Sequence, residues 1–353
     1  MKRNKILITG NEAMAQGAID AGCQLYAGYP ITPQNEFIAY MARRMPELGR
    51  IFIQAESELA AINMVFGAAA SGARAMTSSS SPGISLKQEG ISYLAGAQLP
   101  AVIVNVMRGG PGLGNISPAQ SDYFQATRGG GHGDYRSIVL APSTVSESYD
   151  YMFKAFDLAD KYRTAVILLS DGMLGQMMEP IVVQSSEYRV QRSKLRAKPW
   201  ALTGCKGRKP NIIRSLYLAD GALEKLNLIL QKKYKAIEEK EQRYESLFLD
   251  DAKIILVAYG TMARISKNVV KRLRDQGKKI GFIRPITLWP FPKKAFTAQP
   301  SSPRRYLVVE MSYGQMWEDV LLAVEGKAEV DFFGRAGGAI PSEEEIIKKI
   351  KSF

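Results

Sequence analysis

Short apolar runs of β-type residues alternate with helix-like stretches through the first half of the chain. The apolar runs predict strands at residues 6–9, 25–27, 51–55, 73–77, 101–106, 138–141 and 165–170. Helical periodicity between them predicts helices at residues 13–21, 33–45, 57–71, 85–96, 118–127 and 145–162. Strands this apolar are buried on both faces, which is typical of a parallel, doubly wound α/β sheet.

The pattern changes after residue 186. Periodicity fails and positive charge rises between about residues 187 and 211, which indicates a linker or an extended arm, and residues 220–249 then carry the apolar stripe of a long helix. A second α/β unit follows, with strands predicted at 254–258, 280–283, 306–310 and 329–333 and helices at 260–273 and 315–325. We therefore divide the chain into a first domain (1–186), a basic connecting region with a long helix (187–250) and a second domain (251–353).

Composition places the chain among soluble globular proteins. Its 353 residues are 46% hydrophobic and 23% charged, which suits two domains with substantial cores. The basic start of the chain precedes only a three-residue apolar run, and no apolar stretch reaches the roughly 20 residues that cross a bilayer. The sequence predicts a cytoplasmic protein without a membrane segment.

The formal charge of +13 raises the question of nucleic-acid binding. No recognisable DNA- or RNA-binding module accompanies the charge, so we expect no nucleic-acid partner. A solvated connector is the simplest interpretation, although a basic surface also suits an acidic partner subunit, acidic ferredoxin or the phosphates of coenzyme A. The charge gathers between the two domains, at Arg189, Arg192, Lys194, Arg196, Lys198, Lys206, Arg208 and Lys209.

Two cysteines and one histidine limit the metal chemistry of the chain. A cluster held by four thiolates needs more cysteines than the chain has, and the spacing of Cys23, Cys205 and His132 fits no zinc pattern. We predict no metal site in this chain. If the protein handles electrons, its metal centres belong to another subunit.

Three segments carry candidate chemistry. The stretch Gly28-Tyr29-Pro30-Ile31-Thr32-Pro33 predicts a strand end followed by a helix, with Thr32 as N-cap and Pro33 in the first turn. Glu58 lies near a second predicted helix start, and Arg108 follows a third strand. Because such loops gather along one edge of a parallel sheet, we expect an acid, a cation and a hydroxyl to form one site.

The amino-acid sequence of these segments resembles that of the alpha subunit of 2-oxoacid:ferredoxin oxidoreductases, above all the branched-chain (2-oxoisovalerate) branch. The similar stretches are residues 29–33, 54–61, 75–83 and 107–112, and residues 284–292 resemble the family's second domain. The resemblance implies a thiamine-diphosphate-binding fold, with a pyrimidine-type first domain and a transketolase C-terminal-like second domain. It also implies oxidative decarboxylation of a 2-oxoacid to acyl-CoA and carbon dioxide, with electrons passed to ferredoxin.

Alternatives to this activity stay open. The same chemistry on 2-oxoglutarate or pyruvate is one, and a non-redox thiamine-dependent decarboxylase or acetolactate synthase-like half is another. A scaffold that kept the fold and lost its chemistry is the non-enzymatic alternative. The polar run 78–81 and the apolar Leu113 favour a branched aliphatic acid, because a second substrate carboxylate would need another cation or donor.

The resemblance assigns roles to individual residues. Glu58 would face N1′ of the thiamine aminopyrimidine ring and share a proton with it, while Thr32 and Tyr29 would meet the 2-oxoacid and Arg108 would bind its carboxylate. Further contacts to the cofactor would come from Pro30, Ile31, Ser80 and Gly110.

Each of these residues also has a structural interpretation. Glu58 could simply interact with the positive end of the helix dipole, and Glu56 could be the catalytic acid in its place. Thr32 could be a helix cap with no catalytic role. Arg108 could form a surface ion pair. His132, in a glycine-rich stretch, could shuttle protons, although most single histidines are structural.

This chain lacks the diphosphate-binding elements of thiamine enzymes, and their absence predicts that it works with partner subunits. Thiamine enzymes hold the diphosphate through a metal, a Gly-Asp-Gly element and a following Asn, whereas Asp171-Gly172 lacks the preceding glycine and no matching Asn follows. The chain therefore resembles only the pyrimidine-side half. It implies a beta subunit that shares thiamine diphosphate and holds Mg²⁺, iron–sulfur clusters on that or other partners (a gamma or a ferredoxin-like delta subunit), and coenzyme A as co-substrate.

Overall fold

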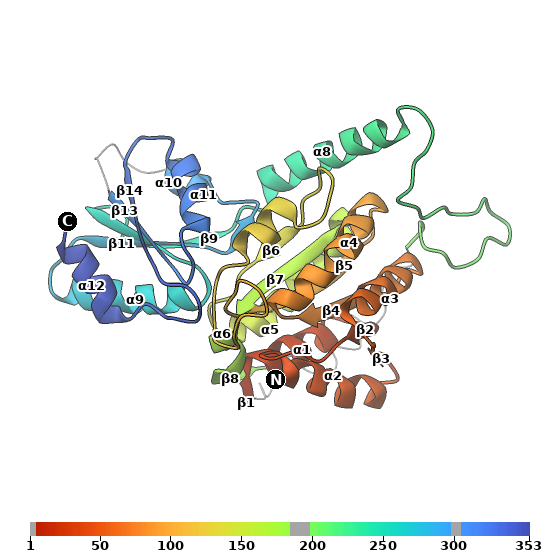
Figure 1. Cartoon of the computed structure of the whole chain (residues 1–353), viewed down its shortest axis with the longest axis horizontal. Coiled ribbons are helices and arrows are strands. Elements are labelled where there is room, and N and C mark those ends of the chain that lie inside the picture. The colour runs from red at the N-terminus through yellow and green to blue at the C-terminus, as the bar shows by residue number, and fades with distance from the viewer. Residues whose placement is uncertain (1–4, 184–197, 298–304) are drawn as a thin grey trace.

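The computed structural model describes residues 5–183, 198–297 and 305–353 and contains two α/β units side by side (Figure 1). The larger sheet has the order β12-β6-β7-β5-β4-β2-β3, and β12 alone runs antiparallel to its neighbour. Its strands are β2 (Leu25–Gly28), β3 (Ile51–Gln54), β4 (Ala75–Ser79), β5 (Ala101–Met107), β6 (Ile138–Leu140), β7 (Ala165–Asp171) and β12 (Thr287–Trp289). β5 and β7 are buried along their whole length, as expected for a parallel sheet covered on both faces.

The helices of the first unit form two groups. α3 packs against α4, and α1 packs against both α2 and α5. They are α1 (Gly10–Asp20), α2 (Asn35–Glu47), α3 (Glu58–Ala70), α4 (Ser81–Gly96), α5 (Val145–Tyr162) and the short α6 (Gly172–Gln176). Helices α1, α3 and α5 each begin after a residue whose side chain accepts a hydrogen bond from the backbone of the first turn. These residues are Thr9, Ser57 and Thr144, and such capping residues are a local sequence signal for a helix start.

The second unit is a five-stranded sheet of order β14-β13-β10-β11-β9, parallel except for β9. Its core surrounds Leu256, Phe282 and Leu307. Its strands are β9 (Tyr244–Leu247), β10 (Ile254–Val257), β11 (Ile280–Pro285), β13 (Arg305–Glu310) and β14 (Glu329–Gly334). Its helices are α9 (Gly260–Asp275), α10 (Lys294–Thr297), α11 (Gln315–Val324) and α12 (Glu343–Lys351). The predicted α/β class, with a second α/β unit, is confirmed.

Several predicted boundaries were wrong. β1 (Lys5–Thr9) does not join the parallel sheet but pairs antiparallel with β8 (Met178–Val182), because an apolar run does not specify its partner. The long helix predicted at 220–249 is α8 (Ala222–Lys240), and the residues after it pair with β11 as β9. The helix predicted at 118–127 is a loop that ends in a π-helical turn (Gln125–Gly129).

Part of the connecting region lies outside the described residues. The part that is not described comprises residues 187–197, which include Arg189, Arg192, Lys194 and Arg196. The described stretch 198–221 has neither helix nor strand and leads into α8 at the edge of the first unit (Figure 1).

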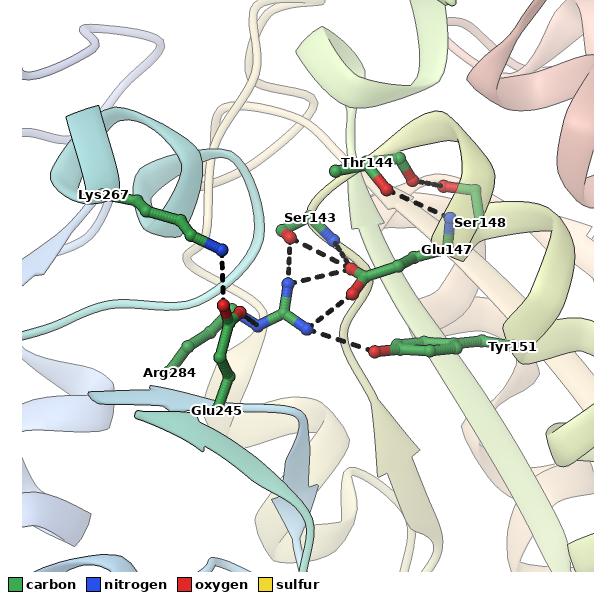
Figure 2. Close-up of polar contacts among 8 residues, drawn as sticks. All are labelled: Ser143, Thr144, Glu147, Ser148, Tyr151, Glu245, Lys267 and Arg284. Atoms are coloured by element: carbon green, nitrogen blue, oxygen red, sulfur yellow. Dashed lines mark hydrogen bonds and ion pairs between the residues drawn. The ribbon is translucent and has the colours of Figure 1, made fainter. Parts of the chain in front are cut away.

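A buried arginine joins the two units. The Arg284 side chain, 4% exposed, donates from Nη1 and Nη2 to the two Glu147 oxygens at 2.9 and 2.7 Å. It also contacts Ser143, Tyr151 and Glu245, so its guanidinium lies among groups from both units (Figure 2). Burial alone would raise the pKa of Glu147, but hydrogen bonds and charge from Arg284 outweigh it and lower that pKa.

We expect Arg284→Met to lower the free energy of unfolding by about 3–5 kcal/mol, because it leaves the partly buried Glu147 carboxylate without its cationic partner. Glu147 has a lowered folded-state pKa, so its stabilisation is present above the pKa of a free glutamate and is lost as pH falls through the folded-state value. The difference between wild type and variant should therefore shrink in acid. Denaturant unfolding at neutral pH and below about pH 4 measures both effects.

Lys267→Met is the matched control, since Lys267 contacts Glu245 at the border of the same cluster but is 35% exposed. We expect a loss below about 1 kcal/mol. Equal losses in the two variants would contradict the role given to Arg284.

Candidate active site

The loop after β2 differs from its predicted form. The Thr32–Pro33 peptide bond is cis, and α2 begins at Asn35 with Gln34 as its N-cap residue, so the prediction that Thr32 caps a helix starting at Pro33 was wrong. The Thr32 hydroxyl instead accepts a hydrogen bond from Asn35 Nδ2 at 3.2 Å. A residue before proline prefers extended backbone, so the same residues fit a turn as well as a cap.

Buried polar contacts hold this loop from beneath. Ser78 Oγ donates to Gln34 Oε1 at 2.7 Å and also hydrogen-bonds the Tyr26 hydroxyl at 2.8 Å. Asn11 Nδ2 donates to the carbonyl of Pro33 at 2.8 Å. Above these contacts Tyr29 and Pro30 are exposed, and Ile31 and Thr32 are partly exposed. The loop is thus a fixed backbone that presents side chains outward.

Glu58 is the first residue of α3 and is 6% exposed. The first turn of α4 lies directly against it, because a Cβ added to Gly83 would come within 2.5 Å of Glu58 Oε1 and closer still to Ser79 Oγ. Only glycine leaves room for the carboxyl group here. Its rival Glu56 is exposed, so the structure separates the two acids.

The serine run is the end of β4 and the start of α4, whereas a polar loop with a helix from residue 85 was expected. The reason is that Pro82 is compatible with a first helical turn, where it loses no hydrogen bond. The hydroxyls of Ser79 and Ser80 are buried and have no hydrogen-bond partner among the described residues. An unpaired buried hydroxyl costs about 1–3 kcal/mol, so these two atoms fit the polar groups of a ligand.

Arg108 follows β5, is buried, and binds two loop carbonyls. Nη1 donates to Thr32 O at 2.9 Å and Nη2 to Leu113 O at 2.8 Å, while Nε is buried without a partner among the described residues. The Arg108 backbone N–H donates to Ser81 Oγ at 3.0 Å, which ties Arg108 to the α4 start. The first turn of α4 thus contacts both the Glu58 carboxyl group and Arg108, and the Arg108 side chain in turn contacts the loop that contains Thr32.

Sequence reasoning missed the polar residues behind this contact. Asp122 Oδ2 accepts hydrogen bonds from Ser81 Oγ at 2.6 Å and from Asn105 Nδ2 at 2.9 Å. Burial raises the pKa of Asp122, against the effect of these two hydrogen bonds. No local signal marks Asp122, because it lies in a stretch that was interpreted as a helix.

The loop after Arg108 is anchored on the second unit. Gln120 Nε2 donates to Tyr259 O, and Gln120 Oε1 accepts from the backbone of Met311, both at 2.9 Å. Asn115 Nδ2 donates to Gly337 O at 2.9 Å. A Cβ on Gly110 would meet no atom within 4 Å, so the backbone there is open to a ligand. The second unit therefore positions the loop that contacts Arg108.

His132 lies elsewhere. It is exposed, its carbonyl accepts a hydrogen bond from Ser92 Oγ at 2.7 Å, and its ring lies 6.4 Å from that of Tyr93. Ser92 is three turns along α4 from Ser81, about 16 Å at about 1.5 Å per residue. The structure does not bring His132 together with Glu58 and Arg108.

Asp171, the residue nearest to a diphosphate-binding motif, has a structural contact. Its Oδ1 accepts hydrogen bonds from the backbone of Met173 and Leu174 and from Thr261 Oγ1 of the second unit. Within residues 5–183, 198–297 and 305–353, no three His, Cys, Asp or Glu side chains are grouped to bind a metal ion. None of the helices in those ranges is long and apolar enough to cross a membrane.

Comparisons with known proteins agree with the resemblance in the sequence. Residues 16–242 match the family described as pyruvate flavodoxin/ferredoxin oxidoreductase, thiamine diphosphate-binding, and residues 252–346 match pyruvate:ferredoxin oxidoreductase core domain II. The chain is 50% identical to ketoisovalerate oxidoreductase subunit VorB of Methanothermobacter marburgensis, over 98% of this chain and 97% of that protein. It is 37% identical to 2-oxoglutarate synthase subunit KorA of the same organism, over 97% of each.

A solved structure has the same fold. The 2-oxoglutarate:ferredoxin oxidoreductase from Magnetococcus marinus, with 2-oxoglutarate, coenzyme A and succinyl-CoA bound, matches with a TM-score of 0.87 and 26% identity. The match covers 99% of this chain and 65% of the solved chain, so this chain spans just under two thirds of that protein. Two family models and a half-identical, full-length relative agree: the chain belongs to the 2-oxoacid:ferredoxin oxidoreductase family, as one of its subunits.

Proposed function

We propose that this chain is the subunit of a ketoisovalerate-type 2-oxoacid:ferredoxin oxidoreductase that provides the pyrimidine side of the thiamine diphosphate site and binds the 2-oxoacid. The complex would convert 2-oxoisovalerate and related branched acids, with coenzyme A, to acyl-CoA and carbon dioxide and pass electrons to ferredoxin. The observation that carries the proposal is the buried Glu58 carboxyl group, packed on Gly83 and joined through the start of α4 to Arg108.

The residues around Glu58 fit the aminopyrimidine side of the cofactor. The buried, unpaired hydroxyls of Ser79 and Ser80 would take its polar atoms, and Pro30, Ile31 and Gly110 would contact it across the loops. Bound thiamine diphosphate supplies the thiazolium carbon that makes loss of carbon dioxide from a 2-oxoacid possible. Glu58 would hold a proton between its carboxyl oxygen and the ring nitrogen in a site with little water.

Arg108 is suited to the substrate carboxylate. Nη1 and Nη2 bind the carbonyls of Thr32 and Leu113 in the two loops beside the site, and Nε is buried without a partner among the described residues. A planar guanidinium matches both oxygens of a carboxylate. Tyr29 and Thr32 would contact the rest of the acid. Leu113, 79% exposed beside Arg108, offers an apolar surface, which supports a branched aliphatic substrate.

The site needs a second protein. Large apolar side chains are exposed on the segments that surround it, which suits a surface covered by another subunit. They are Tyr29, Leu59, Leu86, Leu113 and Ile116. We assign the diphosphate, Mg²⁺ and the iron–sulfur clusters to a beta subunit and to gamma or ferredoxin-like delta subunits. The cysteine content supports this, because the chain has two cysteines, one buried and one exposed, whereas an iron–sulfur cluster needs four thiolates.

Reduction of ferredoxin or viologen by the assembled complex, with a panel of 2-oxoacids, tests the substrate. We expect kcat/KM for 2-oxoisovalerate to exceed that for pyruvate by at least about tenfold, the lower end of what extra methyl groups gain in an apolar pocket. We expect 2-oxoglutarate to be poorer still, because its second carboxylate would meet Leu113.

A complex reconstituted without this chain is the control and should be inactive. Equal or better rates with pyruvate or 2-oxoglutarate would defeat the substrate assignment. Release of carbon dioxide without reduction of ferredoxin would instead support a non-redox decarboxylase.

A further inference from the structure

Lys87 is a fully buried lysine beside the proposed catalytic acid. It lies on α4 with 0% exposure, one helical turn after Gly83, the residue whose Cα lies against the Glu58 carboxyl group. Residues four apart share a helix face, so Lys87 and Gly83 face α3 together. Its Nζ donates to the backbone carbonyl of Glu58 at 3.2 Å.

The surroundings do little to stabilise an ammonium group here. Lysine is almost never fully buried unless paired, because taking a charge out of water is costly. Among the described residues, Nζ makes one hydrogen bond although it has three donors, and that bond goes to a neutral carbonyl. Burial lowers the pKa of Lys87 to about 8, and the Glu58 carboxylate opposes this shift.

Glu58 is the charged group that acts on Lys87 within the described residues. Glu56, two residues earlier, is exposed. The hydroxyls of Ser79 and Ser80, from the segment before α4, are neutral. Folding stability alone would favour an apolar side chain at position 87, since α4 packs against α3 and β5. A charged group here therefore points to the site that it adjoins.

We propose that Lys87 is a positioning residue of the active site, which holds the first turn of α3 and places a positive charge near the Glu58 carboxyl group. Its ammonium group lies on the α4 face that packs against the Glu58 carboxyl group, and its hydrogen bond to the Glu58 carbonyl fixes the first turn of α3. The carboxyl group is then held in one position, where it can share a hydrogen bond with a ring nitrogen of the cofactor. This inference rests on the role proposed for Glu58, and it does not require Lys87 to touch cofactor or substrate.

The first test is the pH profile of kcat for the assembled complex carrying Lys87→Met. Removing a positive charge near a carboxyl group favours the protonated acid, so we expect the acidic limb to move upward by about one pH unit or more, with KM for the 2-oxoacid nearly unchanged. Lys87→Gln keeps a donor to the Glu58 carbonyl but lacks the charge, so it should move the limb equally. It also provides the measurement if the methionine variant does not assemble.

Lys233→Met is the matched control. Lys233 also donates to a backbone carbonyl, that of Arg163 at 3.1 Å, and burial lowers its pKa to about 8 as well, but it lies on α8. The control should leave the acidic limb in place. An unmoved limb in both Lys87 variants, or an equal shift in the control, would overturn the proposal.

A second test needs no cofactor. Denaturant unfolding of the full chain as wild type, Glu58→Gln, Lys87→Met and the double variant forms a double-mutant cycle. We expect the effect of Lys87→Met on the unfolding equilibrium constant to differ at least about fivefold between the wild-type chain and the chain that already carries Glu58→Gln. Additive effects would overturn the pairing. If Glu58→Gln keeps full turnover while coupling is present, the proposed function fails and the pairing stands.

Discussion

Replacing Glu58 by glutamine should reduce turnover of the assembled complex by about 10²- to 10⁴-fold, the range in which a positioned acid or base contributes to rate. Glutamine has nearly the same shape, so it should fit against Gly83 as glutamate does, in a space where a Cβ would already lie 2.5 Å from Oε1. It cannot, however, exchange a proton with a ring nitrogen. The loss should therefore appear in kcat and leave folding and association intact.

The measurement is 2-oxoacid-dependent reduction of ferredoxin, with size-exclusion chromatography of the complex as the check on assembly. Glu56→Gln is the matched control, because Glu56 is the neighbouring acid and is exposed. It should retain near wild-type rates. A Glu58→Gln complex that turns over normally would remove the central residue of the proposed site.

Replacing Arg108 by lysine should raise KM for the 2-oxoacid by about 10- to 100-fold, which corresponds to about 1.5–3 kcal/mol for a hydrogen bond to a charged group. Lysine keeps the charge but loses the planar pair of donors that match a carboxylate. Its single nitrogen also replaces the two nitrogens that reach the carbonyls of Thr32 and Leu113, so the contact between these two loops should loosen. KM for coenzyme A should change much less, because only the 2-oxoacid carboxylate is assigned to Arg108.

Arg50→Lys is the control for the structural part of this effect. Arg50 also bridges two backbone carbonyls, those of Ile19 and Cys23, although both bonds come from its Nη1 atom. It lies on the connection from α2 to β3, outside the proposed site. The control should lose some stability and leave KM for the 2-oxoacid unchanged. An equal rise of KM in both variants would show that Arg108 acts through folding alone.

Local signals explain which elements could be predicted from the sequence. α5 begins and ends at its predicted residues, and α3 differs by one residue at each end, because Thr144 and Ser57 cap them and their apolar positions repeat at helical spacing. The same rules failed at Thr32, at the serine run and at residues 118–127. At Thr32 and at the serine run a neighbouring proline is compatible with more than one local structure. At residues 118–127 the outcome depends on hydrogen bonds to residues distant in the sequence, such as the contact between Gln120 and Tyr259.

The sequence by itself determined the α/β class, the second α/β unit and the family. Apolar periodicity and the residues of several short motifs are local properties of the chain, so they can be read before it folds. The sequence also identified Glu58, Thr32 and Arg108 as candidates. Only the tertiary structure decided which of the candidates lie together, and it separated His132 from the rest. It also revealed Asp122 behind Arg108 and Lys87 beside Glu58, whose environments are created by burial and by contacts 17 to 41 residues apart in the chain. Burial and long-range contacts exist only after the chain has folded, and they turn ordinary polar residues into a site.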